Sequence, residues 1–129
     1  MEINKIKWKR VYEKVLQNDG FRILVDRLWP RGVKKETVKI DYWAKIITPT
    51  KEIREAYHKG AIDFETFSNY YRKELEENKN FGEFKELILK ELEKGNVTLV
   101  YASKTPELSH IPVLREFVEK MVKDSLNKK

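Results

Sequence analysis

Two short apolar runs place the tightest limit on how this chain folds. The first is FRILV at residues 21–25, and the second is NVTLVYA at residues 96–102. Continuous apolar runs of this length are typical of strands that are covered on both faces, as in a parallel sheet. About seventy residues of mostly helical periodicity separate the two runs. Because parallel strands need a long crossover between them, this arrangement predicts an α/β fold.

A further strand is predicted before these two, in IKWKRVY at residues 6–12. Its side chains alternate in character, which is typical of a half-exposed edge strand. The gap of about eight residues before FRILV is short for a crossover and long for a tight hairpin, so the direction of its pairing stays open. Helices are predicted in TKEIREAYHKG, DFETFSNYYRKELEE, NFGEFKELILKELEKG and SHIPVLREFVEKMVKDSL.

Together these elements predict a single α/β domain over residues 1–129, with residues 124–129 as a frayed C-terminal tail. The sheet is small and at least partly parallel, with three strands or slightly more, and about four helices flank it. The sequence contains no internal repeat and no linker that would divide it.

The composition argues against several classes of protein and site. The chain has no cysteine and only two histidines, so disulfides, thiolate nucleophiles and cysteine metal sites are excluded, and we predict no metal and no cofactor. No apolar run approaches the roughly 18 residues of a membrane helix, and the N-terminus lacks the apolar segment of a signal peptide. We therefore expect a cytoplasmic protein without membrane contact.

The net charge of +6 favours an acidic partner, such as nucleic acid or a phosphorylated small molecule. Lysine and glutamate are also mixed along the predicted helices, a pattern that is typical of solvated helix faces and of thermophilic proteins. The charge alone does not separate these interpretations.

Charged residues follow the two apolar strands directly, in DRLWPRG at residues 26–32 and in SKTPELSH at residues 103–110. If the strands are parallel, both segments emerge at the carboxyl edge of the sheet, where ligands of open α/β sheets bind. Arg54, early in the first middle helix, is expected to point into the same space. The candidate site residues in the two segments are Asp26, Arg27, Trp29, Pro30, Arg31, Gly32, Lys104, Ser109 and His110.

These residue types predict an anion-binding site. Arginine grips phosphate or carboxylate with two parallel hydrogen bonds, and the exposed amides at the start of the last helix attract an anion. The predicted catalytic residues are His110, as an acid or base that titrates near neutrality, and Asp26, which orients the arginines. Trp29 and Pro30 are expected to fix the turn, and Gly32 to permit close approach of the backbone.

Each of these residues also has a purely structural interpretation. Asp26 can pair with an arginine as a structural salt bridge, Trp29 and Pro30 can be packing residues, and His110 can cap a helix. Aromatic residues beside lysine and arginine raise the alternative of a nucleic-acid-binding or regulatory protein without catalysis. These aromatic residues are Trp8, Tyr12, Tyr70 and Tyr71, of which Tyr71 also fits core packing on its helix. A scaffold that pairs with itself is a third hypothesis, and a monomer and a homodimer both stay open.

Four stretches together resemble the YeaO-like branch of the family known as domain of unknown function 488. They are RILVDRLWPRGVKKE, DYWAKIITPTKEIREAYHKG, FSNYYRKEL and VTLVYASKTPELSHIPVLREFV, and DRLWPRG is the most specific of them. The resemblance covers nearly the whole chain. It implies a small cytoplasmic α/β protein from a bacterium or archaeon, and it implies no activity.

The resemblance also points to particular residues. The arginine-rich loop of the family matches Asp26–Gly32, and its helix-opening Leu-Arg pair matches Ile53 and Arg54. Wider relatives resemble CAExxxxxCHR after the last strand, where this chain has Ala102 and His110 but lacks both cysteines, the glutamate and the final arginine. This departure argues against thiol or metal chemistry, whereas the arginines of the first loop and the histidine are present.

Overall fold

The computed structural model describes residues 4–127. Its contacts divide the chain into two compact units. Within the described residues, the first unit comprises the chain up to Thr48 together with Glu86–Lys104. The second comprises Pro49–Lys85 and the chain from Thr105 onward. The expectation of a single domain stays a prediction.

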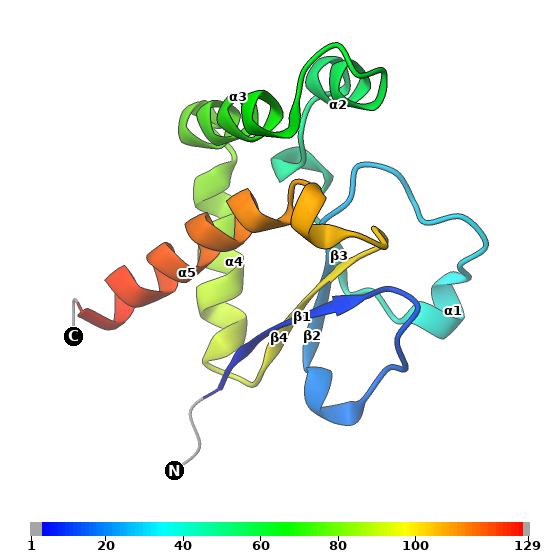
Figure 1. Cartoon of the computed structure of the whole chain (residues 1–129). Coiled ribbons are helices and arrows are strands. Elements are labelled where there is room, and N and C mark those ends of the chain that lie inside the picture. The colour runs from blue at the N-terminus through cyan, green and yellow to red at the C-terminus, as the bar shows by residue number, and fades with distance from the viewer. Residues whose placement is uncertain (1–3, 128–129) are drawn as a thin grey trace. The chain divides into compact units, whose positions relative to one another are not determined.

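The first unit contains a sheet of four parallel strands in the order β1-β4-β2-β3 (Figure 1). The strands are β1 (Ile6–Arg10), β2 (Phe21–Leu24), β3 (Tyr42–Trp43) and β4 (Val97–Tyr101). The predicted α/β class and parallel sheet are confirmed. The first strand is an edge strand, as expected, and the structure settles its direction because it pairs parallel with β4.

Strand β3 has no counterpart among the predicted elements. It comprises two residues, and backbone hydrogen bonds on either side of it attach the chain to β2. The amide of Asp41 donates to the carbonyl of Arg22, and the amide of Ala44 donates to that of Leu24, each at 2.8 Å. Two residues are too few to show a strand period, so the sequence pattern did not reveal it.

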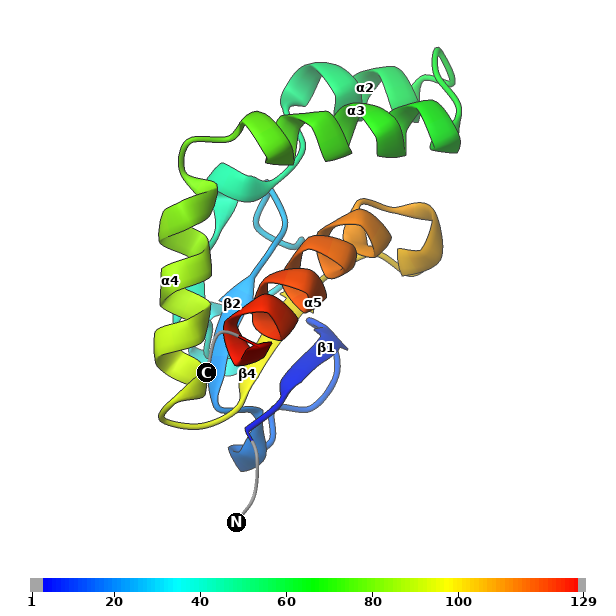
Figure 2. The ribbon, with the colours of Figure 1, turned by 90° about the vertical axis from the view of Figure 1, so that its left-hand side faces the viewer.

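All four predicted helices are present, as α2 (Lys51–His58), α3 (Phe64–Glu77), α4 (Phe81–Leu92) and α5 (Ile111–Asn127). Shorter helical turns are α1 (Lys35–Val38), η1 (Gln17–Asp19), η2 (Lys45–Ile47) and η3 (Pro106–Leu108). In the second unit α2 and α3 lie side by side (Figure 2), and the rings of Tyr57 and Phe67 stack 4.6 Å apart. The carboxylate of Asp63 accepts from the amide of Thr66 at 2.8 Å and caps α3.

The predicted frayed tail, residues 124–129, is helical in α5 up to Asn127, and residues 128–129 lie outside the described part of the chain.

None of the helices described is both long and apolar enough to cross a membrane.

One face of the sheet in the first unit is polar near the amino ends of the strands. Lys7, Thr98 and Arg22 are neighbours in one row across β1, β4 and β2, and Lys9 lies two residues along β1 on the same face. The Thr98 hydroxyl donates to the carbonyl of Asp19 at 2.7 Å, so the loop before β2 packs on this face.

Toward the carboxyl ends, the same face is apolar. Val11, Val38 and Val100 form a buried cluster there, against which four partly buried residues pack. These residues are Trp29, Val33, Ile40 and Ala102. Segments between the strands therefore cover this face.

Candidate functional site

The loops after β2 and β4 are joined at the carboxyl edge of the sheet. The carboxylate of Asp26 accepts a hydrogen bond from the amide of Ala102 at 2.8 Å. The backbone carbonyl of Asp26 accepts from the indole of Trp43 at 2.6 Å, which also connects the loop to β3. Asp26 thus connects the ends of three parallel strands, and these two hydrogen bonds support its structural interpretation.

Trp29 and Pro30 have packing roles. The indole of Trp29 donates to the carbonyl of Val33 at 2.7 Å, and its ring lies edge-on to Trp43 with 5.5 Å between centroids. Pro30 is buried. Gly32 has φ +75°, and a Cβ at this position would meet no atom within 4 Å. The turn therefore needs the positive φ of Gly32, and the expectation that this glycine also permits close approach of the backbone to a ligand stays a prediction.

Several basic residues belong to the segments that end or follow the strands at this edge. Arg31 is exposed, and its carbonyl accepts from the hydroxyl of Tyr12 at 3.3 Å. Arg27 is half-buried and Lys104 is exposed. The sequence analysis missed Arg10, whose guanidinium lies 4.9 Å from the Tyr12 ring centroid and donates to the carbonyl of Ala102 at 3.2 Å. Its position as the last residue of an edge strand was the signal that could have identified it.

Three of the predicted site residues lie in the second unit. Arg54 on α2 is half-buried, and its Nε is buried without a hydrogen-bond partner. The hydroxyl of Ser109 donates to the carbonyl of Pro106 at 2.7 Å and accepts from the amide of Ile111 at 3.1 Å, so it organises the start of α5. The prediction that Arg54, Ser109 and His110 join the residues at the sheet edge stays a prediction.

The ring of His110 packs edge-on against Tyr71 in the second unit, with 5.8 Å between centroids. The carbonyl of His110 accepts from the amide of Leu114 at 3.1 Å, which places His110 at the first turn of α5. Tyr71 is fully buried, which confirms that it is a core residue and not a surface for stacking.

The sequence analysis also missed a buried ionic cluster at the amino half of the sheet in the first unit. Its centre is Asp19, which has no exposed surface. The Asp19 carboxylate contacts Lys7 at 2.7 Å, Lys9 at 3.0 Å and Arg22 at 2.7 Å, and it also accepts from the amide of Leu16 at 3.1 Å. Burial acts to raise the pKa of Asp19, but the hydrogen bonds from Lys7, Lys9 and Leu16 outweigh it and hold the pKa well below its usual value of 3.8.

A signal for this cluster is present in the sequence. Arg22 interrupts the apolar run FRILV, and Lys7 and Lys9 alternate with Ile6 and Trp8 on β1. Charged residues inside strands are rarely buried without a partner of opposite charge. The partner is Asp19 in the turn QNDG at residues 17–20, although the composition of QNDG by itself indicates only a turn.

Side chains that could hold a metal ion do not converge within residues 4–127: no group of three or more histidine, aspartate or glutamate side chains is close enough. The segments at the sheet edge carry cationic side chains, aromatic rings and the Asp26 carboxylate, which accepts from a backbone amide.

Comparison with known proteins places the chain in a family. The family described as the inactive DUF488-N3 subclade matches residues 5–129. The chain belongs to this family. The predicted resemblance to the family of domain of unknown function 488 is thus confirmed, and the match covers nearly the whole of this chain.

Relatives in bacteria are similar along most of their length. The DUF488-N3 chain is 41% identical to the uncharacterized protein YeaO of Escherichia coli (strain K12) over 116 residues, which are 90% of this chain and 98% of that protein. It is 34% identical over 114 residues to the uncharacterized protein Rv3073c of Mycobacterium tuberculosis (strain H37Rv), covering 88% of this chain and 93% of that one. The comparison with solved structures found no match.

Proposed function

We propose that this chain binds a small molecule that bears a phosphate or a carboxylate, at the carboxyl edge of its sheet, and that it does so without catalysis. The observation that carries the proposal is the hydrogen bond between Asp26 and Ala102, which joins the segments that bear Arg27, Arg31 and Lys104. Cations held at the ends of parallel strands supply the charge and the donors that an oxyanion requires.

Three observations favour binding without catalysis. The family is described as inactive, and this chain lacks the cysteines, the glutamate and the arginine of the wider pattern after the last strand. The carboxylate of Asp26 already accepts from a backbone amide, which favours a role in positioning the loops. Binding is thus the function that the remaining cationic residues support best.

The test is a ligand screen by thermal shift, because a ligand that binds only the native state raises its stability. The ligands are inorganic phosphate, sugar phosphates, nucleotides and small dicarboxylates. We expect at least one to stabilise the wild type, and we expect Arg31→Ala to weaken its binding by about tenfold or more, since a hydrogen bond to a charged group contributes roughly 1.5–3 kcal/mol. Arg31 is exposed, so this variant should fold normally.

Lys120→Ala is the matched control, because it removes one exposed positive charge from α5. The same loss of binding in both variants would show a nonspecific charge effect and would contradict the proposal. Stabilisation that is equal in the wild type and in Arg31→Ala would also contradict it. Adding His110→Gln to the screen tests the separate prediction that His110 contributes to binding.

A second candidate function, nucleic-acid binding, is favoured by one feature of the first unit. A hollow of about 700 Å³ is lined by Tyr12, Lys14, Lys34 and Lys39, among others, and Tyr12 is 54% exposed. An exposed aromatic ring beside lysines is the arrangement on which single-stranded nucleic acids stack.

For this candidate we expect single-stranded RNA or DNA to bind with an affinity that falls steeply with salt, because bound phosphates displace counterions from the strand. Fluorescence anisotropy with a labelled oligonucleotide, measured at low and moderate salt, gives the slope. Tyr12→Ala should weaken binding by about 1–3 kcal/mol if a base stacks on the ring. An affinity that is independent of salt, or equal in wild type and variant, would rule out this interface.

A further inference from the structure

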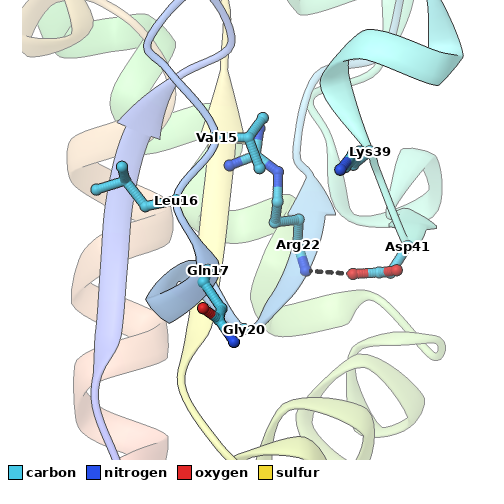
Figure 3. Close-up of a pocket in the computed structure, with 7 residues that line it drawn as sticks. All are labelled: Val15, Leu16, Gln17, Gly20, Arg22, Lys39 and Asp41. Carbon is cyan, nitrogen blue, oxygen red and sulfur yellow. Dashed lines mark hydrogen bonds between the residues drawn. The ribbon is translucent and has the colours of Figure 1, made fainter.

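A second hollow in the first unit lies near the amino end of β2, at the opposite end of that strand from the loop that bears Asp26. It has a volume of about 430 Å³ and opens between the loop before β2 and the segment before β3. Figure 3 shows Leu16 and Gln17 on one side of the view, Lys39 and Asp41 on the other, and the Arg22 side chain between them; Val15 also lines the hollow.

Arg22 has one donor group that the protein does not satisfy. Its Nε donates to the carbonyl of Val38 at 3.0 Å, and its Nη1 donates to Asp19 at 2.7 Å. Its Nη2 is buried and has no hydrogen-bond partner. The Arg22 residue as a whole is only 2% exposed, so bulk solvent does not supply the missing acceptor. A buried guanidinium nitrogen without an acceptor is costly, and it calls for an acceptor from outside the chain.

Positive charge exceeds negative charge around this nitrogen. Lys7, Lys9 and Arg22 share the single carboxylate of Asp19. The carboxylate of Asp41 accepts from the backbone amide of Arg22 at 2.9 Å. Lys39, the remaining cation of the hollow, adds a further positive charge to its lining. A partly buried surplus of cations attracts an anion more strongly than the same charges would in water.

The backbone of Lys39 is also unusual. Its φ is +49°, and it is the one residue other than glycine with a positive φ in the part of the chain that the structure describes. This conformation at the end of α1 is the usual place for a glycine, and a lysine there is strained because its Cβ lies close to the following carbonyl oxygen. A strained residue that presents a charge to a hollow is typical of a binding site.

From these observations we infer that the hollow beside Arg22 is a second anion site, which takes a small organic acid through its carboxylate or phosphate group. Nη2 of Arg22 and the ammonium group of Lys39 donate to the oxygens of the anion, and the apolar side chains of Val15 and Leu16 contact its carbon skeleton. Because Nη2 is buried, binding requires a small shift of the lining at Val15, which is only half-buried in its loop.

The test uses the full-length chain with inorganic phosphate and succinate as probes, at constant ionic strength set with chloride. Side-chain ¹H–¹⁵N NMR signals of arginine report directly on Arg22, and their shifts during titration give a Kd. We expect the Arg22 signals to shift with at least one probe. Lys39→Asn should raise the Kd by about tenfold, since it removes a charge-assisted hydrogen bond and asparagine tolerates a positive φ.

The matched control is Lys5→Asn, which removes an exposed charge of the same unit that does not line the hollow. Unchanged Arg22 signals with both probes would overturn the inference, as would equal Kd values for Lys39→Asn and wild type. This site is independent of the one at the carboxyl edge. Binding that is lost in Arg31→Ala but kept in Lys39→Asn would support the first site and overturn this one.

Discussion

Asp19→Asn should lower the free energy of unfolding by about 3–5 kcal/mol, because removing one partner of a buried ionic cluster leaves the other charges uncompensated. In the native structure the Asp19 carboxylate has no exposed surface and contacts Lys7, Lys9 and Arg22. An asparagine of the same size fills the space but carries no charge. Urea denaturation followed by circular dichroism measures the change.

Two variants make this measurement specific. Asp63→Asn changes the charge of an exposed residue that caps α3, and asparagine caps a helix as well as aspartate, so the stability should hardly change. Adding Lys9→Met to Asp19→Asn removes one of the uncompensated cations and should restore part of the lost stability. A loss below about 1 kcal/mol for Asp19→Asn would mean that water reaches the three cations and replaces the carboxylate.

The pH dependence provides a second measurement of the same cluster. The pKa of Asp19 in the folded protein is lowered relative to its usual value of 3.8, because hydrogen bonds from Lys7 and Lys9 to the ionised form outweigh the opposing effect of burial. The stabilisation is therefore complete above the unfolded pKa and is lost as the pH falls through the lowered folded pKa. Below about pH 4, the unfolding free energy of Asp19→Asn should fall less steeply than that of the wild type.

The sequence predicted the fold well where a segment has its own period. Residues 21–25 and 96–102 were predicted as buried strands, and both are central strands of the sheet. The helix predicted in DFETFSNYYRKELEE is present, and the carboxylate of its first residue, Asp63, caps it. These features depend on residues that are close together in the sequence, so the sequence of one chain is enough to predict them. Strand β3 depends on hydrogen bonds to β2, and no local pattern encodes it.

The candidate sites were less predictable because they depend on contacts between distant residues. DRLWPRG is conspicuous in the sequence, but the hydrogen bond from Ala102 that gives Asp26 its role spans 76 residues. The alternation along residues 6–12 predicted a half-exposed edge strand but did not indicate that Lys9 is buried against Asp19. Alternation along a strand tells which residues share a face, but it does not tell what covers that face.

Gly20→Ala should be among the most damaging substitutions in the chain and should lower the free energy of unfolding by more than about 3 kcal/mol. Gly20 has φ +67°, and a Cβ on it would collide with the backbone carbonyl of Asn96. That carbonyl accepts from the amide of Phe21 at 2.9 Å and so anchors the start of β2 beside β4. The backbone cannot move away without breaking this bond.

Gly60→Ala is the control that separates the collision from the backbone strain. Gly60 has φ +78°, close to that of Gly20, but a Cβ there would meet nothing within 4 Å. Its replacement should therefore cost only the strain of a positive φ, about 1–2 kcal/mol. Urea denaturation of both variants gives the comparison, and equal losses would show that the chain near Asn96 yields to the extra methyl group. A larger loss for Gly20 would show that the close approach of Gly20 to Asn96, where the pairing of β2 with β4 begins, leaves no room for a side chain.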